Sequence, residues 1–316
     1  NFCDETEKPV IICCSDSAVD VIDLNVNILF KKYIIASINE TEGLLHQYMN
    51  KQNQSELFER LNIKKLPTLT IRPMDYSDKN CKYPVILKPA ASIDGKKSDI
   101  RVCRDSTSLN AAILEFEDKR YNRVLVQPYL EFRIEYVIVG AINRKLLSYT
   151  LLKNIRQWPI DSGTGTYSEF VNDSKIHGYA RSVLRKIIEF GYSGPIDIEF
   201  FVDKNEKFYI NEINWRSSGR NFVSNFTGVN SIYLWYKSVT NPDYQYVEDV
   251  YKNLGTAMTE STDIKNVFAK NVSLRSWIRE YKECNSYAVH DRDDIKPEIK
   301  RMAKLIYSKL GGLNKA

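Results

Sequence analysis

The chain has 316 residues, of which 43% are hydrophobic and 27% charged, so it can bury a large core and is neither disordered nor fibrous. Its longest apolar runs, Val10–Cys14 and Tyr136–Ile142, fall far short of the ~18 residues that a membrane-spanning helix needs. The balance of 45 Lys and Arg against 40 Asp and Glu gives a net charge of only +5, and the basic residues are scattered. These properties exclude a membrane-spanning protein and argue against a dedicated nucleic-acid binder, while small anionic substrates remain open.

The cysteines and histidines predict no zinc-type site. Six cysteines form no C-x-x-C pair, and only three histidines are present. We therefore interpret the cysteines as buried thiols in a reducing compartment and expect a cytoplasmic protein. The chain begins with Asn1 rather than Met, which suggests that the natural N-terminus is missing or trimmed.

Residues 1–65 have the pattern of a partial α/β unit. Val10–Cys14 is typical of a buried strand, Ala18–Tyr33 has helical spacing of apolar residues, and Ile34–Ile38 suits a second short strand. Glu42–Leu61 predicts a helix with a polar break that begins at Asn50.

Residues 66–130 predict an α+β segment in which strands surround one helix. We expect the helix at Ser106–Lys119. The expected strands are Thr68–Arg72, Pro84–Lys88, Asp99–Cys103 and Arg123–Gln127.

Residues 131–316 predict two hairpins, a long helix and a helical end. A loop is expected at 161–166, and the segment beyond Thr227 is expected to be mostly helical and to end in a basic amphipathic helix. The hairpins are Glu135–Ile142 with Lys145–Lys153 and Ile196–Asp203 with Phe208–Asn214, and the helices are Lys175–Phe190 and Glu298–Leu310.

The second hairpin carries the strongest chemical signal. If Asp203 and Phe208 close it, one face carries two opposed pairs and is continued by Arg216: Asp197 with Asn214, and Glu199 with Glu212. Two carboxylates at about 5 Å repel each other unless a cation or proton lies between them. Hard oxygen donors at this spacing suit magnesium. The alternative is a solvated face whose carboxylates are balanced by neighbouring basic residues.

Two other segments could meet a nucleotide. Lys88 ends an apolar strand and could neutralise phosphates, although a lysine at a strand end is often only solvent-exposed. The apolar strand Val124–Pro128 is broken by proline and leads into Ile134–Val139. Such a crossing between sheets can offer backbone groups to an adenine and the carboxylate of Glu135 to ribose hydroxyls.

The order of these pieces resembles the ATP-grasp superfamily over the span from Lys51 to Gly228. The pieces are a strand lysine, a strand that enters a hinge, a glutamate, a glycine-threonine loop and a hairpin with E-x-N-x-R. The chain looks most similar to carboxylate-amine ligases with carbamoyl-phosphate-synthase-like domains, including D-aspartate ligases, and the stretch Glu212–Arg220 is the most specific. The resemblance implies an α+β ATP-grasp fold in which two α+β subdomains, 66–130 and 131–316, grip ATP after a partial α/β domain at 1–65.

The resemblance also implies site residues for ATP and for Mg²⁺, with Mn²⁺ as a possible substitute. The nucleotide would contact basic residues at its phosphates, a hinge at its adenine and a carboxylate at its ribose: Lys51 and Lys88, Gln127 and Tyr129, and Glu135. The metal ligands would be Glu199, Glu212 and Asn214. Three arginines would act on the reacting groups, namely Arg216 on the transferred phosphate, Arg220 on a substrate carboxylate and Arg156, with the 163–165 loop, on the acyl group.

The implied function is an ATP-dependent, ADP-forming C–N ligase that activates a carboxylate as an acyl phosphate and joins it to an amine, expected to be an amino acid. The small-molecule carboxylate and amine are its expected partners, and a homodimer is a possible assembly.

Two features depart from the family pattern: Trp215 stands where proline is common, and the 90–98 loop is poor in glycine. The alternatives are a non-catalytic ATP-binding regulatory module and an enzyme that phosphorylates a carboxylate or carbamate without ligation.

Overall fold

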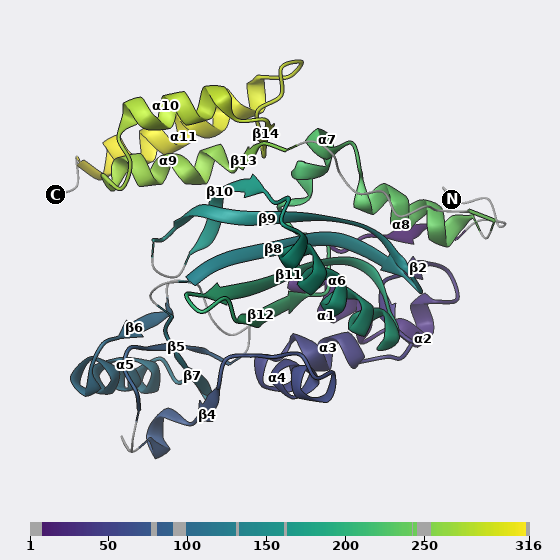
Figure 1. Ribbon diagram of the computed structural model, residues 1–316, viewed down its shortest axis with the longest axis horizontal. Helices are drawn as coiled ribbons and strands as arrows, with labels where there is room; N and C mark the ends of the chain where they lie inside the picture. Colours follow the sequence, from purple (N-terminus) through teal and green to yellow (C-terminus); the bar gives the residue numbers. More distant parts are fainter. Residues whose placement is uncertain are drawn as a thin grey trace.

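The computed structural model describes residues 8–76, 81–90, 99–130, 133–160, 163–241, 243–244 and 254–313. Two mainly antiparallel sheets organise these residues (Figure 1). The smaller sheet has the strand order β4-β7-β5-β6, with bounds Leu69–Ile71, Val124–Pro128, Val85–Pro89 and Arg101–Cys103. The four strands predicted between residues 66 and 130 are thus confirmed. The predicted 90–98 loop lies outside the described residues from position 91 onward.

Helix α5 (Ser106–Asp118) packs on the smaller sheet, as the periodicity predicted (Figure 1). It begins at a capping box in which the Asp105 carboxylate accepts a hydrogen bond from the backbone N–H of Ser108 at 2.7 Å. Its buried residues recur at helical spacing and pack on the strand core. They are Leu109, Ala112, Ile113 and Phe116.

The larger sheet has the strand order β12-β11-β8-β9-β10-β13-β14, and β3 (Ser37–Ile38) also pairs with β11. The long strands are β8 (Arg133–Asn143), β9 (Leu146–Trp158), β10 (Thr164–Phe170), β11 (Tyr192–Asp203) and β12 (Phe208–Asn214), and the short ones are β13 (Thr256–Met258) and β14 (Ser286–Tyr287). Both predicted hairpins are confirmed. The predicted loop at 161–166 is wrong from Thr164 onward, because β10 begins there and pairs with β9.

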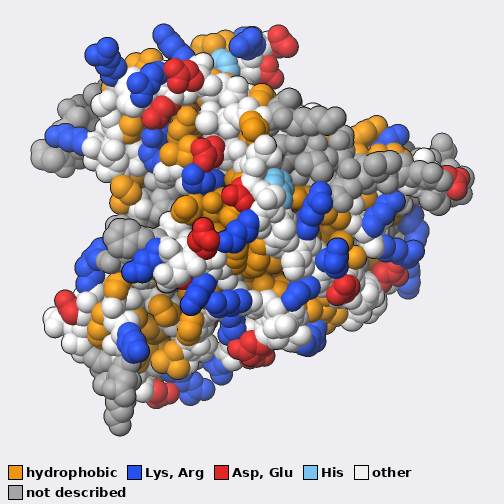
Figure 2. Space-filling view, in the orientation of Figure 1, with side chains coloured by type: hydrophobic (Ala, Val, Ile, Leu, Met, Phe, Trp, Pro, Cys, Tyr) orange, Lys and Arg blue, Asp and Glu red, His pale blue; other side chains and the backbone are white. Residues whose placement is uncertain are grey.

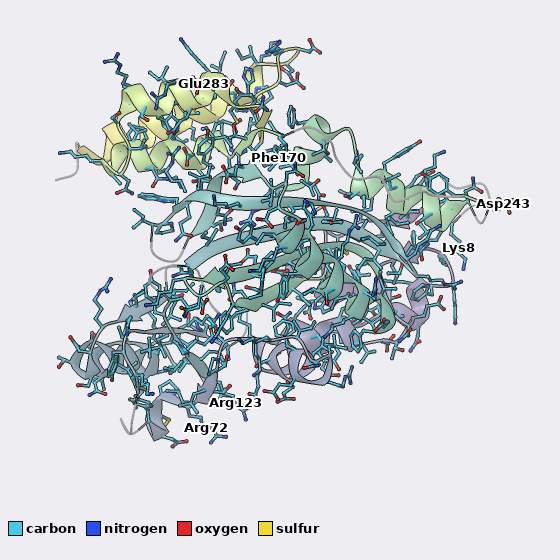
Figure 3. All side chains as sticks on the ribbon, in the orientation of Figure 1. Lys8, Arg72, Arg123, Phe170, Asp243 and Glu283 are labelled. Atoms are coloured by element: carbon cyan, nitrogen blue, oxygen red, sulfur yellow. The ribbon has the colours of Figure 1, made fainter. Side chains whose placement is uncertain are left out.

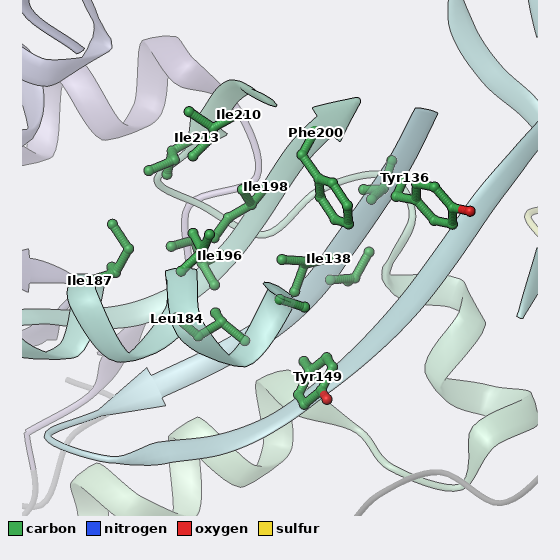
Figure 4. Close-up of a cluster of buried hydrophobic side chains, with 14 of the residues drawn as sticks. Tyr136, Ile138, Tyr149, Leu184, Ile187, Ile196, Ile198, Phe200, Ile210 and Ile213 are labelled. Atoms are coloured by element: carbon green, nitrogen blue, oxygen red, sulfur yellow. The ribbon is translucent and has the colours of Figure 1, made fainter. Parts of the chain in front are cut away.

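The main core lies between the larger sheet and helix α6 (Ser174–Glu189), as Figure 4 shows. Asp173 caps this helix by accepting hydrogen bonds from the N–H groups of Lys175 and Ile176. Phe200 is fully buried and stacks on Tyr136 with ring centroids 5.3 Å apart. Because the apolar face of β11 enters this core, its opposite face is left for polar residues.

The N-terminal segment is joined to the larger sheet. It contains β1 (Val10–Ile11) paired in parallel with β2 (Ile34–Ile35), and the helices α1 (Asp16–Asp23), α2 (Val26–Leu29), α3 (Leu44–Met49) and α4 (Lys51–Arg60). Ile38, Leu45 and Leu57 belong to the same core cluster as the strands of the larger sheet. The single strand predicted at Ile34–Ile38 is divided between two sheets, since β2 pairs with β1 and β3 pairs with β11.

The residues after β12 are mostly helical, as predicted. They form α7 (Ser224–Thr227), α8 (Ser231–Thr240), α9 (Glu260–Phe268), α10 (Leu274–Glu283) and α11 (Lys296–Leu313). The last three lie together beyond β10 and β13 (Figure 1). Within the described parts of the chain, none of the helices has the length and apolarity to cross a membrane. Lys and Arg side chains are spread over the face shown in Figure 2, with acidic side chains among them.

Candidate active site

A cavity of about 460 Å³ lies between the two sheets. Strands β5 and β7 contribute residues from the smaller sheet, and β8, β11 and β12 contribute residues from the larger one. Figure 3 shows the side chains that the two sheets and the helices carry in the described parts of the chain. Ten of the eleven predicted site residues line the cavity: Lys51, Lys88, Gln127, Tyr129, Glu135, Glu199, Glu212, Asn214, Arg216 and Arg220.

The register of the β11–β12 hairpin brings the predicted carboxylates together. Glu199 pairs with Glu212, and Asp197 pairs with Asn214, as predicted. The closing pair, however, is Val202 with Phe208, one residue away from the predicted closure. A β-bulge between the pairs Glu199–Glu212 and Phe200–Ile210 shifts the register by one residue. The predicted pairs therefore form because of the bulge, which strict alternation along the strands does not predict.

The bulge residue is Asn211, which also lines the cavity and which sequence reasoning missed. Its side-chain amide donates a hydrogen bond to Glu199 Oε2 at 3.3 Å. Ile210 and Ile213 are both buried, although they lie three positions apart. Two apolar core residues at an odd spacing on one strand are the sequence signal that could have revealed the bulge.

Two lysines lie close to the two carboxylates in the cavity lining. Lys51 Nζ lies 3.8 Å from Glu212 Oε2. Lys88 is only 9% exposed, and burial together with the nearby charge of Lys51 lowers its pKa to about 8. Burial removes the water that would stabilise the charged form of this lysine. A bound anionic ligand would stabilise that charge in place of the water.

Arg216 is held by a carboxylate that sequence reasoning did not place in the site. Its Nε donates to Asp16 Oδ1 at 2.6 Å, and its terminal nitrogen donates to Asp16 Oδ2 at 3.2 Å. The same terminal nitrogen donates to Asn214 Oδ1 at 3.3 Å. Burial acts to lower the pKa of Arg216, but the bond to Asp16 and the nearby acidic charges raise it overall. No local sequence signal links Asp16 to Arg216, because 200 residues separate them.

Arg220 is a buried cation with open hydrogen-bonding capacity. Among the hydrogen bonds of the described residues, none involves its two terminal nitrogens, which are both buried. The nearest acidic contact is an ion pair with Glu199 Oε1 at 3.8 Å. A buried guanidinium that lacks hydrogen bonds is costly unless an acceptor is bound to it, so this side chain suits an anionic ligand.

Glu135 and the hinge lie at another part of the cavity wall. The amide of Asn154 donates to Glu135 Oε1 at 2.7 Å. A Cβ at Gly165 would lie 2.1 Å from Asn154 Oδ1, so a side chain there would have to displace the Asn154 amide. The backbone N–H of Tyr129 donates to the carbonyl of Pro84 at 2.9 Å, so it is engaged within the smaller sheet.

Among the described residues, Arg156 is the one predicted site residue that does not line the cavity, because its guanidinium is engaged by carboxylates outside it. Its guanidinium donates to Asp263 Oδ1 at 3.0 Å and to Glu280 Oε2 at 2.9 Å, and it lies over the Tyr167 ring. The Asp263 side chain is fully buried. Arg156 therefore ties β9 to helices α9 and α10, and its neighbour Gln157 lines the cavity instead.

The donor set fits magnesium that shares its coordination with a ligand. Glu199, Glu212 and Asn214 supply only oxygen donors suited to a hard cation. Within the described residues, no group of three or more His, Cys, Asp or Glu side chains is arranged to hold a metal by itself. Two carboxylates and an amide are typical of a Mg²⁺ site that is completed by phosphates and water.

Two sheets enclose a cavity that is lined by Lys88 from the smaller sheet, by Lys51 from α4 and by the carboxylates of the β11–β12 hairpin, and this arrangement is an ATP-grasp fold. Residues 73–240, more than half of the chain, match the family described as carbamoyl-phosphate synthase L chain, ATP binding domain. The chain belongs to this family.

Two curated relatives match parts of the chain. The chain is similar to a D-alanine–D-alanine ligase from a Nitratiruptor species, with 29% identity over 165 residues that cover 48% of this chain and 46% of that protein. A second such ligase, from Wigglesworthia glossinidia brevipalpis, is 26% identical over 208 residues, which are 60% of this chain and 56% of that protein. The chain thus spans about half the length of the curated relatives it matches.

A solved structure has the same fold at low sequence identity. It is N5-carboxyaminoimidazole synthetase from Staphylococcus aureus complexed with ADP. The match has a TM-score of 0.62 and 16% identity, and it covers 79% of this chain and 66% of that one.

Proposed function

We propose that this protein is an ATP-dependent, ADP-forming ligase that joins a carboxylate to an amine, with an amino acid as the expected amine. One observation carries the proposal: two lysines, two opposed carboxylates and two arginines line a single cavity between the sheets. The names of the two curated relatives, both D-alanine–D-alanine ligases, support it.

The cavity residues divide the work of phosphoryl transfer. Lys51 and Lys88 hold the phosphates of ATP and offset their charge. Glu135 binds the ribose, and Gln127 and Tyr129 border the adenine. Magnesium, held by residues of the β11–β12 hairpin, would supply charge neutralisation at the phosphates.

The arginines act on the substrate carboxylate and the transferred group. Arg220 binds the substrate carboxylate through the terminal nitrogens that have no hydrogen bond within the described residues. Arg216 faces the phosphoryl group and stabilises its negative charge during the transfer. The carboxylate oxygen attacks the γ-phosphorus, and ADP leaves. The amine then attacks the acyl carbon of the acyl phosphate, and inorganic phosphate leaves as the C–N bond forms.

The remaining proposals concern location, assembly and the metal. The described cysteines, Cys13, Cys14, Cys81, Cys103 and Cys284, are all free, which supports a reducing, cytoplasmic location. A homodimer and the use of Mn²⁺ in place of Mg²⁺ stay predictions, to be tested by light scattering and by replacement of the metal in the assay.

The function is tested by ADP and phosphate release across a panel of carboxylates and amino acids, with mass spectrometry of the products. We expect a condensed product that appears with one substrate pair, and we expect Glu212→Gln to abolish it. Glu206→Gln is the matched control, because Glu206 lies in the loop of the same hairpin and pairs with the exposed Lys175. A wild type that binds ATP but turns over no pair would favour the regulatory module. A phosphorylated carboxylate without a condensed product would favour phosphorylation without ligation.

A further inference from the structure

Asp16 stands at a junction between the N-terminal segment and the strand that carries the metal ligands. It occupies the first turn of α1, and Ser15 caps that helix by accepting a hydrogen bond from the N–H of Ala18. One residue beyond Arg216, the backbone N–H of Ser217 donates to the carbonyl of Cys13 at 3.1 Å. The loop after β1 and the segment after β12 are therefore joined by backbone as well as by side chains.

The bond between Asp16 and Arg216 has the geometry of an orienting contact. Two nitrogens of Arg216 meet the two oxygens of Asp16, at 2.6 and 3.2 Å. This planar, two-point pairing fixes the plane of the guanidinium as well as its position. The Arg216 side chain is only 17% exposed, so few other polar partners compete for it.

Arg216 in turn orients the side chain of Asn214 through a hydrogen bond. Its terminal nitrogen donates to Asn214 Oδ1 at 3.3 Å, while Asn214 Nδ2 donates to Asp197 Oδ1 at 3.3 Å. The amide is thus held at both ends, which fixes the side of Asn214 that can present oxygen to a metal. Partners of this kind orient metal ligands and usually affect metal affinity strongly.

Without Asp16, the charge of Arg216 has other acidic neighbours. Asp197 and Glu212 are the carboxylates that act on it after Asp16. A guanidinium released from Asp16 is expected to turn toward them and to compete with a metal for Glu212. The carboxylate of Asp16 is therefore as important for where it holds Arg216 as for the charge it neutralises.

We propose that Asp16 is a positioning residue that holds Arg216 and, through it, Asn214 in place for a magnesium–nucleotide complex. The N-terminal segment then completes the site of the ATP-grasp sheets. This inference rests on the proposed function for its metal and nucleotide, but its test reads binding and requires no ligation product.

The experiment is a calorimetric titration of ATP, with Mg²⁺ and with EDTA, into the wild type and variants of the full chain. We expect Asp16→Asn to weaken binding of ATP with Mg²⁺ by about 10- to 100-fold, with little change in EDTA. Asp16→Glu should restore part of the loss. Asp20→Asn, on the same helix but paired with His46, is the matched control and should bind as the wild type does.

A double variant tests whether Asp16 acts through Arg216. In an Arg216→Gln background, Asp16→Asn should add no further loss. The inference is overturned if Asp16→Asn binds like Asp20→Asn, if its loss is equal with and without Mg²⁺, or if the two losses add fully in the double variant. If the wild type binds ATP with Mg²⁺ but forms no product, the proposed function fails while this test still gives an answer.

Discussion

Replacing Lys88 by methionine should stabilise the protein without nucleotide while weakening its affinity for ATP. Burial and the charge of Lys51 lower the Lys88 pKa from its ordinary 10.5 to about 8, which corresponds to about 3 kcal/mol against the charged form. Because the folded pKa is the lower one, this cost is fully present below pH 8 and disappears as the pH rises toward 10.5. Methionine has a similar length and carries no charge to bury.

Denaturant unfolding at several pH values measures this effect. Lys88→Met should be more stable than the wild type by about 3 kcal/mol at pH 7 and by about 2 kcal/mol at pH 9. The difference shrinks because at pH 9 Lys88 is mostly uncharged in the folded wild type, so less of the cost of burying its charge remains. The exposed Lys145 gives a matched control, since Lys145→Met should show no such dependence on pH. The reasoning is refuted if Lys88→Met is less stable at pH 7, or if its advantage does not shrink as the pH rises.

Three other outcomes follow from the same geometry. Wild-type affinity for ATP should fall as the pH rises above 8, because Lys88 must be protonated to neutralise phosphate, and calorimetry should show a flatter profile for Lys88→Met. Arg156→Met should cost about 3–5 kcal/mol in denaturant unfolding, because it leaves Asp263 buried without its cation, and it should leave ATP affinity unchanged in the variant that still folds. Gly165→Ala should weaken ATP binding several-fold by displacing the amide that supports Glu135, and ITP, which differs from ATP only in the base, should lose affinity equally.

Local sequence patterns were sufficient to predict the helices and hairpins whose apolar periodicity and capping residues lie within the element itself. The β8–β9 hairpin, α5 and α6 follow apolar periodicity and capping residues that lie within a few positions of each element. Strand β10 was missed because Thr164–Thr166 is short and polar, and its pairing with β13 depends on residues far along the chain.

The site was predictable where one strand pair defines it and less so where distant segments meet. Glu199 and Glu212 come from one hairpin, so alternation placed them together, although the bulge at Asn211 was hidden. Asp16 reaches Arg216 only through the packing of the N-terminal segment on the larger sheet. The place of Arg156 outside the cavity lining was not predictable, because nothing in the sequence around it indicates that its partners lie on α9 and α10.

The central claim is that Glu199 and Glu212 hold the magnesium of bound ATP. Calorimetric titration of ATP into the wild type and into the double variant Glu199→Gln with Glu212→Gln, each with Mg²⁺ and with EDTA, tests it most directly. The wild type should bind ATP at one site and lose about tenfold or more in affinity when Mg²⁺ is removed. The double variant should bind ATP equally with and without Mg²⁺, and in EDTA at least as tightly as the wild type, because two negative charges near the phosphates are gone. A double variant that still binds ATP more tightly with Mg²⁺, or a wild type that binds no ATP, would contradict this account.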